Sequence, residues 1–219
     1  MPYIGYFQLM KVVDKYVIYD DVNYIKGGWI NRNNILINSE KRLFTIALDG
    51  ASPNKKINEI LIKDDFTKFL RSLELSYHKA PYFEQGISLM RDILKFEDKN
   101  LSLFIGNSFR AISNYLDFNT EFLYSSKIEK DNELRAEKKV ISICKSLGAS
   151  EYYNAIGGKE LYSKENFETN GLKLHFLKTN QIEYKQFGNV FVPNLSIIDI
   201  LMFNSKAEIN QFLDNYTLE

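Results

Sequence analysis

The spacing of apolar residues along the chain switches between a helical period and a strand period. Near the start, Phe7, Met10 and Val13 recur at helical spacing, whereas residues 16–19 form a continuous apolar and aromatic run. An uninterrupted β-prone run is typical of a strand buried on both faces. The pattern therefore predicts a short helix followed by a buried strand.

The next hundred residues predict a hairpin and then three helices. Residues 35–38 and 42–48 are β-rich and flank a polar turn, which indicates a β-hairpin, and residues 58–64 add a short strand. Asp64 is suited to cap a helix with one apolar face, formed by Phe66, Phe69, Leu70, Leu73 and Tyr77. We expect two more helices, one after 80–83 that ends at Leu94 and one over about 101–116.

In the second half, strands and helices alternate. We expect a strand at 121–128, a long helix from Asp131 closed by Gly148, a strand at 151–155, a helix at 164–170 and a strand at 171–177. Two S-x-x-D/E patterns, Ser196 with Asp199 and Ser205 with Glu208, predict capping boxes of consecutive helices. This alternation indicates one α/β domain over 1–219, with a mixed or mainly parallel, Rossmann-like sheet and a helical insertion near 64–118.

Composition narrows the class of protein. The chain has 219 residues, is 45% hydrophobic and carries 28 basic and 28 acidic residues, so its formal net charge is zero. That balance argues against a nucleic-acid binder held by a broad basic field. The sequence has a lone cysteine, Cys144, and it has neither an apolar run of about 20 residues nor a signal-peptide pattern. We therefore expect a cytoplasmic protein without a membrane span.

One segment concentrates residues that are suited to chemistry. Residues 19–33, YDDVNYIKGGWINRN, directly follow the predicted buried strand, and ligands of open α/β sheets bind beyond the carboxyl ends of strands. Asp20 or Asp21 is a candidate general base, although side chains alternate along a strand, so only one of the two need face a cleft. The remaining candidates are anion clamps, a stacking surface and amide donors, namely Lys26, Arg32, Trp29, Asn31 and Asn33. The alternative is a surface turn with Trp29 in the core.

Weaker candidates lie elsewhere. Gly157, Gly158 and Lys159 follow a short strand and would suit an anion-binding loop, although a plain turn has the same composition. His78 is a candidate acid or base, but a lone histidine at a helix end is more often only exposed. The amphipathic rings of Tyr3 and Tyr6 suit a ligand cleft as well as a core.

No metal site follows from the sequence. The two histidines, His78 and His175, lie far apart and lack the ligand spacing of a zinc site. His175 lies in an alternating strand and is expected to be structural. We therefore predict no residues that bind a metal. The sequence does not identify a cofactor, and Mg²⁺ is the one option that stays open.

Five segments, in order, resemble the WbqC-like family of bacterial proteins. They are PYIGYFQL, VIYDDVNYIKGGWINRN, APYF, IGGKELY and PNLSIIDILMFN, and they span nearly the whole chain. The resemblance implies a setting in gene clusters for O-antigen and related surface polysaccharides. It also implies a glycine transferase that places an aminoacyl group on the amine of an amino-deoxy sugar.

Such a reaction needs a neutral sugar amine, a base and stabilisation of an oxyanion. The expected partners are a sugar-nucleotide substrate and an aminoacyl donor, which is an aminoacyl-tRNA, an adenylate or a carrier thioester. The zero net charge weakens the tRNA option. Two alternatives stay open: a glycosyltransferase of the same pathway that uses the aspartates to hold a divalent cation, and a non-catalytic sugar-nucleotide-binding protein.

Overall fold

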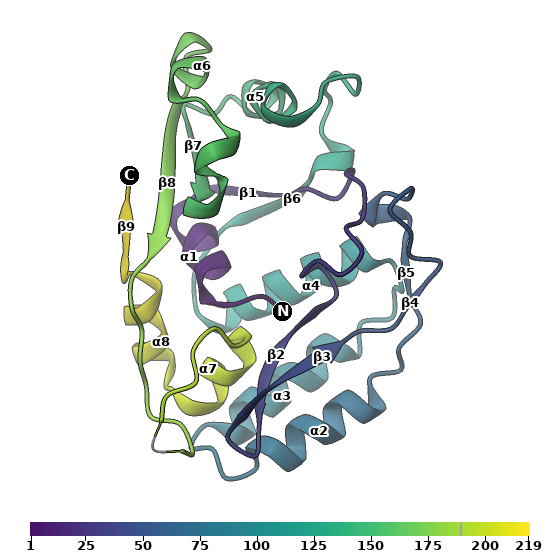
Figure 1. The fold of residues 1–219 in the computed structure, drawn as a ribbon, viewed down its shortest axis with the longest axis vertical. Coiled ribbons are helices and arrows are strands. Elements are labelled where there is room, and N and C mark those ends of the chain that lie inside the picture. Colours follow the sequence, from purple (N-terminus) through teal and green to yellow (C-terminus); the bar gives the residue numbers. More distant parts are fainter. Residues whose placement is uncertain (189) are drawn as a thin grey trace.

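A computed structural model describes residues 1–188 and 190–219 of the chain (Figure 1). The strands are short, and most of the chain between them is helical. The strands are β1 (Lys15–Ile18), β2 (Arg32–Ile37), β3 (Glu40–Thr45), β4 (Leu48–Asp49), β5 (Leu61–Ile62), β6 (Glu121–Tyr124), β7 (Glu151–Ala155), β8 (Lys173–Thr179) and β9 (Tyr216–Leu218).

Eight α-helices and three 3₁₀ turns are found in the described residues. The helices are α1 (Ile4–Val12), α2 (Thr67–Tyr77), α3 (Phe83–Leu94), α4 (Leu101–Tyr115), α5 (Ala136–Ser146), α6 (Lys164–Thr169), α7 (Ile197–Phe203) and α8 (Lys206–Leu213). The 3₁₀ turns are η1 (Ile57–Glu59), η2 (Ser125–Lys127) and η3 (Ile156–Leu161). Within these residues, no helix has the length and apolar character that crossing a bilayer requires.

The strands form four small sheets. β1 pairs with β6 and β7 pairs with β8, both in parallel, while β2–β3, β4–β5 and β8–β9 are antiparallel. β7, η3, α6 and β8 form the strand–helix–strand unit that the alternating pattern predicted. The mixed α/β class is thus confirmed, whereas the structure does not show a continuous Rossmann-like sheet.

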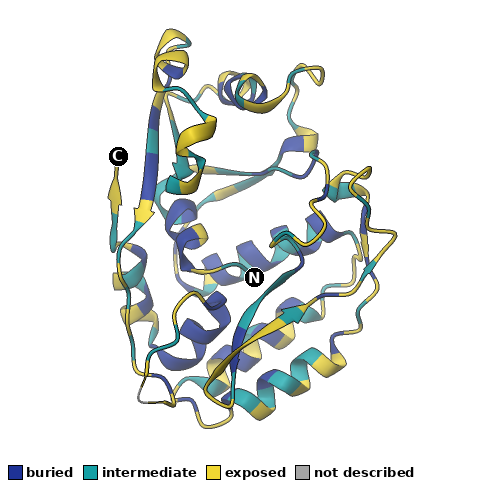
Figure 2. Ribbon diagram, in the orientation of Figure 1, coloured by how far each residue is buried: buried dark blue, intermediate teal, exposed yellow. Residues whose placement is uncertain are grey.

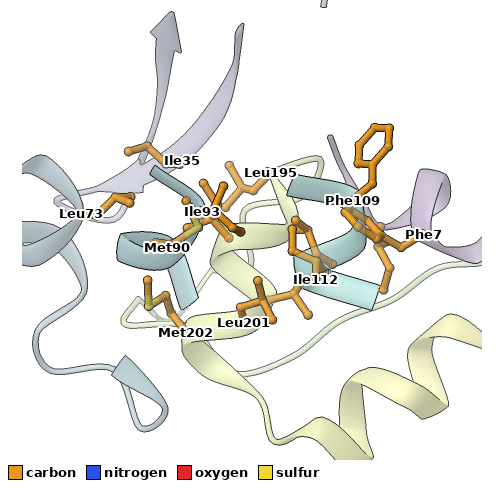
Figure 3. Close-up of a cluster of buried hydrophobic side chains, with 14 of the residues drawn as sticks. Phe7, Ile35, Leu73, Met90, Ile93, Phe109, Ile112, Leu195, Leu201 and Met202 are labelled. Atoms are coloured by element: carbon orange, nitrogen blue, oxygen red, sulfur yellow. The ribbon is translucent and has the colours of Figure 1, made fainter. Parts of the chain in front are cut away.

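The main hydrophobic core surrounds α7. All seven residues of α7 are buried, and Figure 3 shows Leu201 and Met202 among side chains from α1, α2, α3 and α4. Figure 2 shows the buried surfaces of these helices facing one another. Gly86 lets α3 approach α7 closely, because a Cβ there would lie 2.6 Å from Met202 Sδ. Each fully buried Leu, Ile or Met side chain stabilises the fold by about 1.5–3 kcal/mol.

The predicted helical insertion near 64–118 contributes to this same core. Leu73 and Tyr77 of α2, Met90 of α3 and Phe109 of α4 pack in one cluster with Phe7 of α1. The three helices lie where the sequence placed them, but their side chains complete the main core, so the structure does not show a separate insertion.

A second, smaller core lies beneath α5 and α6. Val140, Ile141 and Cys144 of α5 pack against Phe167 of α6 and against Leu174 of β8. β1 separates this region from the main core, as Figure 1 shows by its course below α5 and above α4. The molecule therefore has two packed regions that meet along β1.

Two predicted helix starts differ from the structure for a local reason. Asp131 accepts a hydrogen bond at Oδ1 from the backbone N–H of Glu133 (2.9 Å), which makes a turn, and α5 begins only at Ala136. Likewise Asp64 Oδ1 accepts from the N–H of Phe66 (2.8 Å), and α2 begins at Thr67. Both aspartates form turns ahead of the helix instead of capping it.

Candidate functional site

A large cleft lies where the two packed regions meet. Its volume is about 1540 Å³, and every residue of β1 contributes to its lining. The walls come from α1, the start of β2, α4, α5, β7 and η3. Ligand sites for small molecules typically measure about 300–1000 Å³, so this cleft has room for more than one substrate.

The lining is rich in tyrosine. The contributing side chains are Tyr3, Tyr6, Tyr16, Tyr19, Tyr152, Tyr153 and Tyr162. Burial raises the pKa of the Tyr19 hydroxyl to about 12, and a hydrogen bond to Glu151 with burial raises the pKa of Tyr153 to about 12. Burial likewise raises the pKa of Tyr152 well above its usual value. These phenols stay neutral at physiological pH and can both donate and accept hydrogen bonds.

Tyr3 and Tyr6 form the α1 end of this aromatic lining. Their rings meet edge to face with centroids 5.8 Å apart, and both side chains remain partly exposed. Both residues were predicted to bind substrate, and the structure places both at the cleft.

Asp20 lies in the cleft at the carboxyl end of β1. Its Oδ1 accepts a hydrogen bond from the N–H of Ser126 (2.9 Å), and its Oδ2 accepts from the Ser126 hydroxyl (2.7 Å) and the Ser102 hydroxyl (3.4 Å). Ser126 belongs to η2, and Ser102 to the first turn of α4. The carboxylate therefore joins β1 to two other elements, and it is only 2% exposed.

Asp21 points away from the cleft lining into a buried charge cluster. Its Oδ2 lies 3.0 Å from the Nζ atoms of both Lys130 and Lys139, and its Oδ1 accepts from the Ser125 hydroxyl (2.7 Å). Burial alone would raise the pKa of Asp21, but the hydrogen bonds from Ser125, Lys139 and Lys130 outweigh burial and lower it to about 2. Asp20 and Asp21 thus face different partners, as strand alternation predicted.

The loop after the aspartates presents an exposed aromatic ring at the cleft. Trp29 is 65% exposed and lines the cleft with Gly28, so it is not a core residue. The Arg32 guanidinium lies 5.5 Å from the centre of the Trp29 ring, and Arg32 Nε donates to the Gly28 carbonyl (2.9 Å). Lys26 is exposed on the same loop but does not line the cleft.

The two predicted amide donors have protein partners. Asn31 Nδ2 donates to the Ile46 carbonyl (2.8 Å), and Asn31 Oδ1 accepts from the Tyr24 hydroxyl (2.9 Å). Asn33 Nδ2 donates to the Met1 carbonyl (3.0 Å). Both residues line the cleft, but these contacts hold the backbone of the rim in place.

The predicted glycine loop borders the opposite wall. Gly157 lines the cleft, while Gly158 packs so closely on Asn154 that a Cβ would lie 2.6 Å from Asn154 Nδ2. Lys159 makes an ion pair with Glu219 (2.6 Å), so its charge is already matched. The arrangement brings Gly157 to the site and turns Lys159 to the C-terminal strand.

His78 does not line this cleft. It ends α2, is exposed, and its Nδ1 lies 3.1 Å from the Leu75 carbonyl oxygen. Across the described residues, no group of three or more His, Cys, Asp or Glu side chains is arranged to hold a metal ion.

The sequence reasoning missed a polar group at the start of β7. Glu151 and Tyr153 line the cleft, and their side chains and that of His175 on β8 lie on one face of the sheet. Tyr153 donates to Glu151 Oε2 (2.7 Å), and the Tyr153 ring stacks on His175 with centroids 4.6 Å apart. The alternation in EYYNA carried a signal, since residues 151 and 153 share a face, but the partner strand was needed to add His175.

Comparison with known proteins gives two findings. A family model described as the WbqC-like protein family matches residues 1–211. A relative from Mycobacterium tuberculosis, printed as uncharacterized protein Rv1507c, is 30% identical over 220 residues, which cover 97% of this chain and 93% of the relative. No solved structure matches the chain.

Proposed function

The chain belongs to the WbqC-like protein family, and on this premise we propose that it transfers an aminoacyl group, such as glycyl, in the cytoplasm. The acceptor is the amine of a nucleotide-linked amino-deoxy sugar, in the synthesis of O-antigen or another surface polysaccharide. The observation that carries the proposal is the tyrosine-lined cleft with Asp20 at the end of its floor strand.

The cleft suits a sugar that carries several hydroxyl groups. Neutral phenols such as Tyr19 and Tyr152 offer both donors and acceptors, and their rings give flat apolar surfaces. The volume of about 1540 Å³ exceeds what one small ligand needs, which supports a reaction between two bound substrates.

The loop with Trp29 suits the nucleotide part of the acceptor. The Arg32 guanidinium covers one face of the Trp29 ring and lies 5.5 Å from the ring centre. Trp29 itself is 65% exposed. Nucleobases stack on such rings, and Arg32 and Lys26 provide positive charge for the pyrophosphate. The planar ring and the two cations thus match the two parts of a nucleotide.

The proposed reaction is attack of the sugar amine on the acyl carbon of the donor. The new C–N bond forms as the bond between the acyl carbon and the tRNA ribose oxygen or the adenylate phosphate oxygen breaks. Asp20 accepts the proton that the amine loses, and this proton passes to the departing oxygen. Tyrosine hydroxyls, rather than the occupied amides of Asn31 and Asn33, donate to the developing oxyanion.

The glycosyltransferase alternative receives less support from the charges at the aspartates. Lys130 and Lys139 both lie 3.0 Å from Asp21, so a divalent cation at this pair would have to displace two buried ammonium groups. We therefore rank transfer of an aminoacyl group first.

A product assay by mass spectrometry tests the proposal. The protein is incubated with a nucleotide-linked 4-amino-4,6-dideoxy sugar and either glycyl-tRNA or glycyl adenylate, with and without Mg²⁺. We expect the nucleotide sugar to gain the mass of one glycyl group. Asp20→Asn should lower the rate about 100-fold, because removal of a general base typically costs a factor of 10²–10⁴.

Asp199→Asn is the matched control, since Asp199 is also a buried aspartate but does not line the cleft. It should retain the wild-type rate, with circular dichroism as the check of folding for both variants. Tight binding of the sugar nucleotide without any product would instead indicate the non-catalytic alternative. Transfer of the sugar itself to a lipid-linked acceptor would indicate a glycosyltransferase.

A further inference from the structure

Four tyrosine side chains gather at the end of the cleft near the start of β1. They come from α1 with its N-cap residue, from β1 and from β7, and all line the cleft, namely Tyr3, Tyr6, Tyr16 and Tyr152. α1 contacts β7, and Figure 1 shows α1 beside β7 and the start of β1. We call the space between these four residues the tyrosine slot. Asp20 lies beyond the other end of β1.

The two walls of the tyrosine slot belong to the two packed regions. The Tyr16 ring packs edge to face on Phe109 of the main core, with centroids 6.0 Å apart. The Tyr152 ring stacks on Phe167 of the second core, with centroids 5.4 Å apart and an interplanar angle of 13°. Because both rings are held by the protein itself, a ligand that binds between them does not have to order them.

The hydroxyl groups of the slot are neutral and lie near one another. Burial is the main cause that raises the pKa of Tyr16, with further contributions from Tyr6 and Tyr3. Burial is also the main cause of the raised pKa of Tyr152, to which the Tyr162 and Tyr16 hydroxyls add. Among the described residues, the Tyr16 hydroxyl has no hydrogen-bond partner. It can therefore donate to a ligand or accept from it.

Apolar side chains complete this end of the lining. They come from the α1 and α5 regions, namely Leu9, Val12, Val13, Val140 and Leu147. A nucleobase has two flat faces, which aromatic rings and aliphatic chains can cover, and polar atoms at its edge, which a phenol can reach. The lining of the slot therefore matches the shape and polarity of a nucleobase.

The slot lies at a suitable distance from the proposed site of reaction. Tyr16 and Asp20 are four positions apart, so their Cα atoms are separated by at most about 14 Å. In an aminoacyl adenylate the ribose and the phosphate lie between the base and the acyl carbon, and at the aminoacylated end of a tRNA the ribose does. The base can thus occupy the slot while the acyl carbon of the same donor reaches Asp20.

We propose that the tyrosine slot binds the adenosine of the aminoacyl donor. This inference rests on the proposed transferase function and gives each substrate its own part of the cleft. The donor base lies among the tyrosines and the sugar nucleotide lies at the Trp29 loop, so the acyl carbon and the amine meet beside Asp20. The ring of Tyr6, which is 41% exposed, stacks on the base, and the Tyr16 hydroxyl forms a hydrogen bond with its edge.

Two probes that differ only in the base test the slot without turnover. Glycyl-sulfamoyl-adenosine mimics the adenylate, and its counterpart carries hydrogen in place of the adenine. By calorimetry on the wild-type protein, we expect the probe with the base to bind about 10-fold or more tightly, which is the scale of one stacked base. Equal affinity for the two probes would overturn the assignment.

Variants of the slot identify the residues that hold the base. Tyr6→Ala should remove most of the preference for the probe with the base, whereas Tyr6→Phe keeps the ring and should retain it. Tyr16→Phe loses only the hydroxyl, so a smaller loss is expected. Tyr216→Ala is the control, because Tyr216 lies on β9 and does not line the cleft. Full preference in both Tyr6→Ala and Tyr16→Phe would contradict the proposal.

Photolabelling shows where the base lies. The protein is irradiated with 2-azidoadenosine 5′-monophosphate, and its tryptic peptides are analysed by mass spectrometry. We expect label on residues 1–11 or 16–26, which contain three of the four tyrosines. Label confined to residues 27–32, which contain Trp29, would place the base on the Trp29 loop and overturn the assignment.

The two proposals fail in different ways. If the product assay gives no transfer while the slot still prefers the probe with the base, the adenosine site stands and the transferase proposal falls. If transfer occurs from a carrier thioester and the base adds nothing to binding, the transferase proposal stands and the adenosine site falls.

Discussion

Asp21 and Asp199 are both buried aspartates that join distant segments, but cations surround the first and neutral donors surround the second. Asp21 lies 3.0 Å from two ammonium groups, and those lysines are 1% and 7% exposed. Lys130 also donates to the Ser125 carbonyl, and Lys139 donates to the Asp21 carbonyl (3.3 Å). The cluster thus combines one buried carboxylate with two buried ammonium groups.

No cation lies within ion-pair distance of Asp199 in the described residues. Its Oδ1 accepts from the Tyr77 hydroxyl (2.8 Å), and its Oδ2 accepts from the Tyr184 hydroxyl (2.6 Å) and from Gln186 Nε2 (2.9 Å). Burial raises the pKa of Asp199, and these hydrogen bonds only partly offset burial. The two aspartates therefore have pKa values shifted in opposite directions.

The comparison shows that a buried acid after a strand or at a helix start can join distant segments of the chain. Asp21 holds β1 to η2 and α5, while Asp199 holds α7 to α2 and to the segment around 184–186. Of the three aspartates, Asp20 is the one that lines the cleft, at the end of β1. All three aspartates are buried, so burial does not distinguish them, whereas a position in the cleft lining distinguishes Asp20 from Asp21 and Asp199.

The largest effect is expected for Asp21→Ala. Removing this carboxylate leaves two buried ammonium groups without their partner, which typically costs about 3–5 kcal/mol of the free energy of unfolding. Chemical denaturation in urea measures the change. Native domains have only about 5–15 kcal/mol in total, so the variant should be close to unfolding at 37 °C.

A compensated variant tests whether the charges cause that loss. Asp21→Asn combined with Lys130→Met and Lys139→Met removes the charges of the ion pairs together and should recover most of the stability. If Asp21→Ala costs less than about 1 kcal/mol, the cluster does not have the role that its geometry indicates.

Exchange of the tyrosines that donate to Asp199 should have a smaller effect. Tyr77→Phe removes the donor to Oδ1 and also leaves the N–H of Leu36 without its acceptor (2.8 Å), so we expect a loss of about 1–3 kcal/mol. Tyr184→Phe removes one of two donors to Oδ2 and should cost only about 0.5–1 kcal/mol. Thermal unfolding of the two variants side by side gives the ranking, and equal losses would contradict it.

The sequence predicted local features well and long-range partners poorly, as two capping patterns illustrate. Ser205 and Glu208 form the predicted capping box, in which Glu208 Oε2 accepts from the N–H of Ser205 (2.7 Å). Ser196 with Asp199 has the same pattern, and Ser196 does cap α7, but Asp199 turns to the tyrosines instead. Donors from 77 and 184 reach Asp199 only through the tertiary fold, which no local pattern contains.

The candidate site shows the same limit. The rule that ligands bind beyond strand ends placed Asp20 at the cleft, and the exposed Trp29 lies on the predicted segment. The partner of Asp21 is 118 positions away in Lys139, so spacing gave no sign that this acid was already paired. The sequence also did not predict which strands pair with each other, because each sheet has only two or three short strands.

The pH dependence of stability should differ in sign between the two aspartates. The folded-state pKa of Asp21 is about 2, below the unfolded value of 3.8, so its contribution is present above pH 3.8 and is lost as the pH falls toward 2. The folded-state pKa of Asp199 is raised, so the folded state holds its proton more tightly and the protein gains stability from this group as the pH falls toward 3.8.

Urea denaturation between pH 7 and pH 3 of the wild type, Asp21→Asn and Asp199→Asn measures both contributions. Over that range the advantage of the wild type over Asp21→Asn should shrink, by about 1 kcal/mol once solvent screening is allowed for, and mainly below pH 4. The difference between the wild type and Asp199→Asn should move the other way, in favour of the wild type, and should begin above pH 4. Parallel pH profiles for the two variants would mean that cations and neutral donors affect these carboxylates alike, which the opposite environments argue against.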